Sequence, residues 1–293
     1  MLLELAQVSF TYPDGSTGLR DCSLAIRQGS RNALIGANGS GKTTLFLHTN
    51  GLLQPNRGEL RYAGQAMDYK RHGLRQLRGK VGLVFQNPDR QLFSASVRED
   101  VSFGPLNQGL SEQEAARRVD AALAAVGMED LAHKPVQNLS FGQKKRVCIA
   151  GVLAMEPELL VLDEPMAGLD PSMQAELLAV LERLHANGMT ILLATHDIEF
   201  AYRWADAIHV MKEGACVASF PGNDLAKHGR TLADASLSLP AVIGLQQALA
   251  ANGMLDDLPP FRSSEALLAH LEQLTSKESL MFQQQHRSRA HGR

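Results

Sequence analysis

The feature that most constrains this chain is the stretch GANGSGKT, residues 36 to 43, which fits the pattern G-x-x-x-x-G-K-T. The apolar run NALIG leads into it and the run TTLFLHTNGLL follows, so we expect a strand, a loop and a helix in succession. In that setting the backbone N–H groups of a glycine-rich loop point at phosphate oxygens, and the helix start favours the anion. The predicted phosphate-binding residues are Gly36, Ala37, Asn38, Gly39, Ser40, Gly41, Lys42, Thr43 and Thr44.

Two side chains of the loop and two that follow a later strand carry specific chemistry. Lys42 adds a mobile positive charge, and Thr43 offers a hydroxyl to Mg²⁺. The stretch LLVLDEP, residues 159 to 165, is an apolar strand that delivers Asp163 and Glu164 at its carboxyl end, where open α/β sheets bind ligands. Asp163 is placed to hold Mg²⁺, and Glu164 to orient and polarise an attacking water. Acidic residues can simply end a strand, but together with the phosphate loop they predict a nucleoside triphosphatase of unspecified kind.

Strand-like and helical runs alternate from about residue 1 to 215, which predicts an α/β domain with a largely parallel sheet. Short apolar runs at 32–36, 159–163 and 190–195 are typical of buried parallel strands. A helix lies between the last two: Asp170 can cap it, Pro171 suits its first position, and Asn187 with Gly188 ends it.

The remainder of the chain divides around this core. Residues 111–127 form an amphipathic helical pattern in which Ser111 and Glu114 have capping-box spacing and Gly127 ends the helix. The polar, basic end of the chain is predicted to be disordered. The expected divisions are a nucleotide-binding core at 1–85 and 151–220, a helical subdomain at 86–150, a C-terminal segment at 221–275 and a disordered tail at 276–293.

Charge and cysteine usage narrow the expected partners. The formal net charge of -2 supplies no general basic field, so we expect no nucleic acid partner. Cys22, Cys148 and Cys216 are isolated and are interpreted as structural residues of a reduced compartment. The longest apolar run, residues 147–155, is far shorter than the roughly 20 residues of a bilayer-spanning helix, and no secretory leader is evident. We therefore expect any membrane contact to be made through partners.

The run LSFGQKKRV, residues 139 to 147, is similar to the signature sequence of ABC-transporter ATPases, and it precedes Asp163 and Glu164 as in that family. Other parts occur in the family's order. Tyr12 resembles the aromatic residue that stacks on adenine, Gln86 the glutamine of the Q-loop, Gly168 to Asp170 the D-loop, and His196 the switch histidine.

This resemblance implies an ABC-type P-loop ATPase of the α/β class. Its architecture would be a mixed, largely parallel core sheet with a helical subdomain and a small C-terminal extension. The implied ligands are ATP and Mg²⁺, with Glu164, His196 and Gln86 as catalytic residues and Thr43, Gln86 and Asp163 around the metal.

The family's architecture also implies a head-to-tail dimer in which each ATP lies between the phosphate loop of one copy and the signature of the other. Ser140 and the backbone N–H groups of Gly142 and Gln143 would then meet the γ-phosphate across the interface at a helix start. Phe141 and Asp170 are the other nucleotide-binding residues that the resemblance implies in this half. Phe141 departs from the family's usual glycine, and a non-glycine residue is permitted there if the position has helical φ.

A second resemblance concerns the partners. Residues 84–105, VFQNPDRQLFSASVREDVSFGP, are similar to the segment after the Q-loop in ATPases of energy-coupling-factor importers, and residues 139–157 most resemble the cobalt-importing members. The implied partners are a transmembrane coupling subunit and a metal-binding membrane subunit, at the cytoplasmic face of the cell membrane. Phe93, Val97 and Phe103 are the predicted apolar contacts to a partner helix. In this family a C-terminal segment helps the ATPases to dimerise, a role that residues 237–249 would take here.

Two alternatives stay open on the sequence. A nickel or vitamin importer would use the same ATPase with different membrane partners. A soluble ABC protein acting on ribosomes or DNA would carry fused tandem ATPase units, a long coiled coil or a basic surface, and none of these is visible in the sequence.

Overall fold

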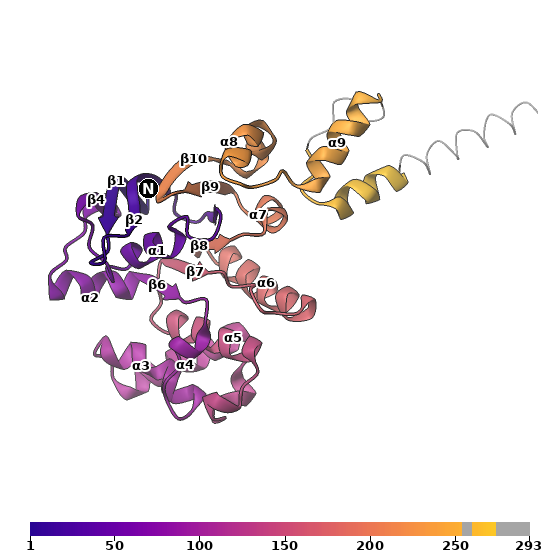
Figure 1. Ribbon diagram of the computed structural model, residues 1–293. Coiled ribbons are helices and arrows are strands. Elements are labelled where there is room, and N and C mark those ends of the chain that lie inside the picture. Colours follow the sequence, from indigo (N-terminus) through magenta and orange to yellow (C-terminus); the bar gives the residue numbers. More distant parts are fainter. Residues whose placement is uncertain (254–259, 274–293) are drawn as a thin grey trace, which may run out of the picture.

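Six strands form the central sheet of the computed structural model, which describes residues 1–253 and 260–273 (Figure 1). Their order is β10-β9-β3-β8-β7-β6; neighbours from β9 to β6 run parallel, and β10 is antiparallel to β9. The strands are β3 (Arg31–Ile35), β6 (Val81–Val84), β7 (Leu159–Asp163), β8 (Thr190–Thr195), β9 (Ala207–Lys212) and β10 (Ala215–Pro221). The predicted runs at 32–36, 159–163 and 190–195 are β3, β7 and β8, which confirms the largely parallel core sheet.

A smaller antiparallel sheet has the order β2-β1-β4-β5. Its strands are β1 (Leu3–Thr11), β2 (Thr17–Ile26), β4 (Arg57–Tyr62) and β5 (Gln65–Ala66). The turn between β1 and β2 is closed by hydrogen bonds from the Tyr12 N–H to the Ser16 carbonyl and from the Gly15 N–H to the Tyr12 carbonyl, both 2.9 Å. This hairpin fixes the backbone of Tyr12 at the end of β1.

The central sheet is buried on both faces, as continuous apolar strands require. Successive residues of β3 show this: Leu34 packs in the core between the two sheets, together with Phe46 and Leu60. Ala33 and Ile35 point the other way, into a second core beneath the helices. With both faces covered, the carboxyl ends of the strands are where side chains can meet a ligand.

Four helices pack around the sheets: α1 (Lys42–Thr49), α2 (Arg71–Lys80), α6 (Pro171–Ala186) and α7 (Ile198–Trp204). Helix α6 confirms the prediction, because the Asp170 carboxylate accepts from the Met173 N–H at 2.8 Å and Asn187 caps the other end. Helix α1 is shorter than the run TTLFLHTNGLL indicated. It stops at Thr49 because Gly51, with φ +69°, turns the chain out of the helix.

A helical lobe lies beyond the β6 edge of the sheet (Figure 1). It contains α3 (Val97–Asn107), α4 (Glu112–Val126) and α5 (Phe141–Leu153), with 3₁₀ turns η1 (Pro88–Arg90), η2 (Glu129–Leu131) and η3 (Val136–Asn138). The expected start and end of α4 are confirmed, since Ser111 caps it and Gly127 is left-handed with φ +66°. The expected capping box forms only in part. Ser111 accepts from the Glu114 N–H, but the Glu114 carboxylate pairs with Arg117 and Arg118 instead.

The chain after β10 forms η4 (Gly222–His228), α8 (Gly229–Asp234), α9 (Ala241–Ala251) and a helix over 264–273. These last two helices extend away from the sheets beside α7 (Figure 1). Each is held to α7 near its start: Glu199 Oε1 accepts from the Ala241 N–H at 2.6 Å, and Arg262 Nε donates to the Tyr202 carbonyl at 2.6 Å. The tail predicted to be disordered, 276–293, lies outside the described residues.

All three cysteines are free, as predicted. Cys22 and Cys148 are buried, and burial raises the pKa of each thiol to about 12. Cys216 is half-buried on β10. The two buried thiols therefore behave as small core residues.

Candidate functional site

The phosphate loop connects β3 to α1 and folds around its own lysine. Lys42 Nζ donates to the carbonyls of Gly36 at 2.7 Å and Ala37 at 3.1 Å. Gly39 and Gly41 have φ values of +78° and +103°, a region that glycine enters without steric cost. Burial lowers the pKa of the Lys42 ammonium, while the neighbouring Glu164 and Asp163 carboxylates act in the opposite direction.

Thr43 and Asp163 meet at the floor of the site. The Thr43 hydroxyl donates to Asp163 Oδ2 at 2.7 Å, which joins the start of α1 to the end of β7. Burial raises the pKa of the Asp163 carboxyl above its usual value, with the Thr43 hydrogen bond opposing that shift. A hydroxyl and a carboxylate are hard oxygen ligands, and Mg²⁺ is commonly bound by one or two carboxylates together with substrate phosphates. This donor pair fits Mg²⁺.

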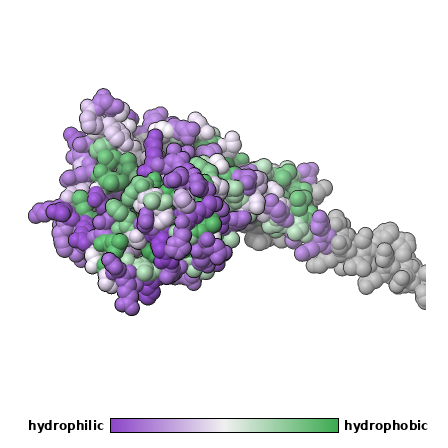
Figure 2. Space-filling model, turned by 90° about the horizontal axis from the view of Figure 1, so that it is seen from below, coloured by the Kyte–Doolittle hydropathy of each residue, from purple (hydrophilic) through white to green (hydrophobic). Residues whose placement is uncertain are grey.

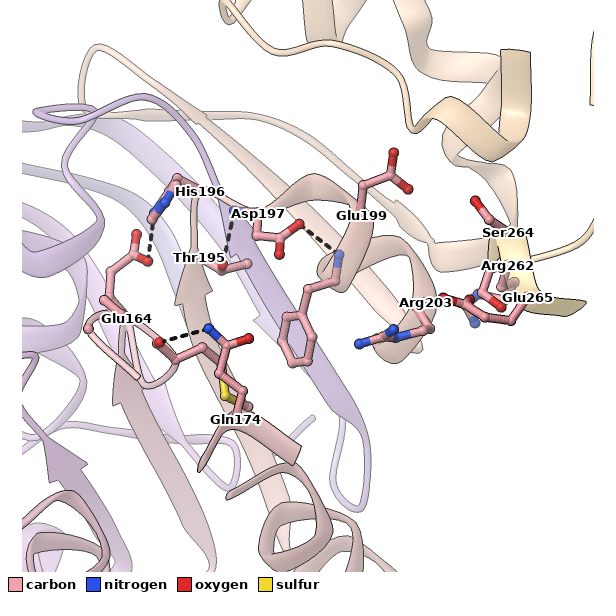
Figure 3. Close-up of a pocket in the computed structure, with 15 residues that line it drawn as sticks. Glu164, Gln174, Thr195, His196, Asp197, Glu199, Arg203, Arg262, Ser264 and Glu265 are labelled. Carbon is pink, nitrogen blue, oxygen red and sulfur yellow. Dashed lines mark hydrogen bonds and ion pairs between the residues drawn. The ribbon is translucent and has the colours of Figure 1, made fainter. Parts of the chain in front are cut away.

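Glu164 and His196 follow the adjacent parallel strands β7 and β8, whose carboxyl ends bring the two side chains together. His196 Nδ1 lies 2.9 Å from Glu164 Oε2, and the two side chains point toward one another (Figure 3). The Glu164 side chain is largely buried, whereas that of His196 is 67% exposed. Glu164 also has φ +46°, a left-handed conformation that costs a non-glycine residue roughly 1–3 kcal/mol.

These groups open onto one cavity of about 390 Å³. It is lined by the predicted residues Tyr12, Asn38, Gly39, Gly41, Lys42, Thr43, Thr44, Gln86, Asp163, Glu164 and His196, and also by Thr17 and Gly18. The Tyr12 and Thr44 hydroxyls are 2.9 Å apart. The sequence reasoning missed Gly18, which must be small because a Cβ there would lie 2.7 Å from Thr44 Cγ2 and 2.9 Å from Tyr12 Cε2.

Three predicted phosphate-loop residues do not line this cavity. Their contacts fix the backbone conformation of the loop. Ser40 is buried, and its carbonyl accepts from the Gly214 N–H at 2.9 Å. A Cβ on Gly36 would collide with the Met211 carbonyl, so the first glycine lets the loop approach β9. Ala37 accepts from the Ser40 N–H at 3.1 Å and closes a turn.

The signature residues lie apart from the phosphate loop of the same chain. Ser140 caps α5 in a capping box: its hydroxyl accepts from the Gln143 N–H at 3.3 Å, and the Gln143 side chain accepts from the Ser140 N–H at 3.0 Å. With Gly142 and Gln143, Ser140 lines a separate cavity of about 150 Å³. Phe141 is the first residue of α5 and has no positive φ, so the condition for a non-glycine residue is met. The Asp170 carboxylate caps α6 and does not line the phosphate cavity.

A family model described as ABC transporter matches residues 19–167, which contain the phosphate loop, the signature residues, Asp163 and Glu164. The chain belongs to the ABC transporter family. Its likeness to relatives in this family covers most of the chain. An energy-coupling factor transporter ATP-binding protein, EcfA of Methanocaldococcus jannaschii, is 45% identical over 85% of this chain and 89% of its own length.

Solved structures of ABC ATPases share the fold. CbiO1 of Clostridium perfringens, described as part of the ABC transporter complex cbiONQ, matches with a TM-score of 0.72 and 43% identity over 84% of this chain and 98% of its own. An ATP-binding cassette solved as a dimer in a post-hydrolysis state with ADP and Pi matches with a TM-score of 0.68 and 28% identity, over 75% of this chain and 98% of its own. The ABC-type ATPase fold is therefore confirmed.

Membership of the ABC family defines the chemistry in outline: the chain binds ATP, and it is an ATPase whose hydrolysis is coupled to transport. Within the residues that the structure describes, no helix combines the length and the apolar character needed to cross a bilayer.

A second cavity, of about 530 Å³, lies on the other side of Glu164 and His196, which line both cavities. Its far wall comes from the C-terminal segment through Arg262, Ser264 and Glu265 (Figure 3). In this ABC ATPase, His196 thus lies between the cavity beside the phosphate loop and the cavity beside the C-terminal segment.

Proposed function

We propose that this chain is the ATP-hydrolysing subunit that energises import of a transition-metal ion, cobalt, through a membrane energy-coupling factor complex. The names of the relatives support this role, since one is an energy-coupling factor ATP-binding protein and a structural neighbour is part of the cbiONQ complex. The chain would act at the cytoplasmic face of the cell membrane, held there by its partners.

The observation that carries the proposal is an apolar groove on the helical lobe. A cavity of about 650 Å³ lies between α2, β6 and α3, and Phe93 and Phe103 line it with exposed fractions of 64% and 51%. Their rings meet edge to face with centroids 4.8 Å apart. Seen from the side of this lobe, hydrophobic patches lie among hydrophilic side chains (Figure 2). Exposed aromatic pairs in a groove are suited to receive an apolar partner helix.

One of the three predicted contacts was wrong. Val97 is fully buried in the core of the lobe, so it supports α3 from inside and cannot touch a partner. Phe93 and Phe103 remain as predicted contacts. The segment after Gln86 links their groove to the proposed nucleotide site. Gln91 Oε1 accepts from the Phe85 N–H at 3.1 Å, so the groove wall and the residue before Gln86 share a direct contact.

Each residue of the proposed site has a separate role in ATP binding or hydrolysis. Lys42 and the loop N–H groups bind the phosphates, and Tyr12 stacks on adenine. Thr43, Asp163 and Gln86 would hold Mg²⁺, which when bound offsets the negative charge of the phosphate oxygens. Glu164 orients and polarises the attacking water, and His196, 2.9 Å from its carboxylate, keeps that carboxylate aimed at the cavity.

A second copy of the chain supplies the signature residues. In the proposed head-to-tail dimer, Ser140 and the N–H groups of Gly142 and Gln143 meet the γ-phosphate bound by the other copy. The C-terminal segment contributes to this dimer through exposed leucines on its two helices, Leu245 and Leu268. ATP closes the dimer, closure moves partner helices docked in the Phe93 groove, and hydrolysis resets them.

The test is recovery of the tagged chain from detergent-solubilised membranes of its host, with a non-hydrolysable ATP analogue present and mass spectrometry of whatever co-purifies. The matched control is the double variant F93S/F103S, which removes the exposed aromatics and leaves the nucleotide cavity intact. We expect the wild-type chain to recover a polytopic subunit and a metal-binding membrane protein, and the double variant to lose both.

The identity of the recovered proteins separates the alternatives. Cobalt uptake by vesicles containing the recovered complex, with nickel and vitamin uptake as comparisons, assigns the cargo. A vitamin-binding membrane protein would redirect the substrate while sparing the mechanism. Recovery of ribosomes or DNA without membrane proteins would end the transporter proposal.

A further inference from the structure

A lysine outside the predicted site is directed into the turn that carries Glu164. Lys145, on α5, is only 3% exposed. Its ammonium donates to three backbone carbonyls: those of Glu164 at 3.2 Å, Pro165 at 2.7 Å and Ala167 at 2.7 Å. An ammonium has three N–H donors, so each of the three has a carbonyl partner within one turn of chain.

This turn has a particular need for such a donor. Glu164 is held with φ +46°, a conformation that an L residue keeps only where its surroundings determine it. Buried carbonyls in a turn also need hydrogen-bond donors, because water does not reach them. Lys145 meets both needs with a single group, since it anchors the turn on both sides of Pro165. Burial lowers the pKa of Lys145 to about 8, and the nearby Glu164 carboxylate opposes that shift.

The signature residues sit on the same helix, one turn away. The Phe141 ring lies over the Lys145 ammonium, 5.2 Å from its centroid, and also covers Gly168, where a Cβ would lie 3.0 Å from Phe141 Cε1. Helix α5 therefore contacts both ends of this turn, the Glu164 end through Lys145 and the Gly168 end through Phe141. The neighbouring Lys144 has a different environment, because its ammonium pairs with Asp89 at 2.7 Å near the surface.

We propose that Lys145 is a positioning residue for ATP hydrolysis, which holds the Glu164 turn from the signature helix α5. The proposal rests on the proposed role of Glu164 as the residue that orients water. It adds a physical link within one chain: when Ser140 and Gly142 engage the phosphate of the other copy, the same helix holds the carboxylate that serves the chain's own ATP.

The test compares K145M, K145Q and the matched control K144M in steady-state hydrolysis and in binding of a fluorescent ATP analogue. We expect K145M to lower kcat about 10- to 100-fold, because displacing a catalytic group by about 1 Å has an effect of that size. KM and analogue binding stay within about twofold, since the phosphate loop is untouched. K145Q retains more turnover than K145M because its amide still donates two N–H groups, and K144M stays close to wild type.

A double-mutant cycle separates positioning from general support of the fold. If Lys145 acts through the Glu164 carboxylate, the variant E164Q/K145M turns over ATP no more slowly than E164Q within about threefold. A purely structural role would add the full K145M loss to that of E164Q. Single-turnover hydrolysis of radiolabelled ATP gives the low rates, and thermal unfolding with bound analogue checks that each variant is folded. If K145M does not fold, K145Q carries the same cycle.

The outcomes distinguish this proposal from the one it rests on. Wild-type turnover by E164Q would overturn the role of Glu164 and the Lys145 proposal with it. A strongly slowed E164Q with additive losses in the cycle, or a K145M variant with unchanged kcat, would overturn the role of Lys145 alone.

Discussion

The two halves of the proposed ATP site are built differently. In the phosphate-loop half, side chains from distant parts of the sequence contact each other directly: Thr43 binds Asp163, and His196 binds Glu164. In the signature half, the polar groups of Ser140 and Gln143 satisfy each other in a capping box on their own helix. The first half is assembled from distant segments, whereas the second is the preformed start of a single helix.

This difference suggests which parts act alone and which need a second copy. The groups proposed to bind phosphate and Mg²⁺ are brought together within one chain. The signature residues line a separate cavity from Lys42, so their proposed contribution to hydrolysis requires a second copy. Variants in the first half should therefore impair each chain by itself, and variants in the second half should impair the neighbour.

The largest effect is expected for E164Q. The amide keeps the shape of the carboxylate but cannot polarise water, so hydrolysis should fall by about 10²- to 10⁴-fold. ATP binding remains, because Lys42 and Thr43 are untouched, and the ATP-bound dimer should accumulate. Size-exclusion chromatography with ATP measures the dimer, and phosphate release measures turnover. Normal hydrolysis by this variant would contradict the assignment of Glu164.

A mixture of two inactive variants tests the head-to-tail arrangement. K42A damages the phosphate loop, and S140R damages the signature. Neither homodimer therefore has a working site. In a mixed dimer, one site combines the intact loop of the S140R chain with the intact signature of the K42A chain. Equal mixing should restore up to about a quarter of wild-type activity if the two sites act independently.

The control for that mixture is K42A mixed with K42A/S140R, which has no intact site in any pairing. Pairing of labelled chains is followed by fluorescence transfer in the presence of ATP. Mixed dimers that form but recover no hydrolysis would count against a site shared between an intact loop and an intact signature.

A smaller loss is expected for H196A. Its imidazole lies 2.9 Å from Glu164 Oε2, so its removal frees the carboxylate to rotate without removing it. We expect kcat to fall about 10- to 100-fold and KM to change little, because the group acts on orientation. H196Q, which can still donate to the carboxylate, should recover part of the loss. A large increase in KM with unchanged kcat would instead assign His196 to ATP binding.

Several features of the site could be predicted from sequence because they are local. The phosphate loop is a contiguous strand, loop and helix, and Ser140 and Asp170 cap the helices that directly follow them. What failed was the direction of individual side chains. Val97 and Phe103 are both apolar residues of α3, but one is buried in the core and the other is exposed. The residue types alone do not show which face of α3 is exposed to a partner.

Lys145 shows a second limit of prediction from sequence, which concerns the hydrogen-bond partners of a buried side chain. It follows Gly142 by three residues and precedes Cys148 by three, so the helical period already placed it on the buried face of α5. That signal was available in the run LSFGQKKRV, but only the structure shows which carbonyls its ammonium meets. The left-handed φ of Glu164 has no sequence signal, because the residue type most typical of that conformation is glycine.

The smallest effect is expected for F141A. Phe141 has helical φ at the first position of α5 and is 40% exposed, and the N–H groups proposed to face phosphate belong to Gly142 and Gln143. Removing the ring uncovers Lys145 but leaves its three carbonyl contacts in place. Turnover should stay within about threefold of wild type, with a stability loss of about 1 kcal/mol from the lost ring contacts.

G142V is the informative comparison, since a Cβ there lies 2.9 Å from Met173 Sδ and displaces the helix start. Chemical denaturation and ATP hydrolysis measured on both variants separate the two positions. An F141A variant as inactive as G142V would mean that the ring itself takes part in the shared site.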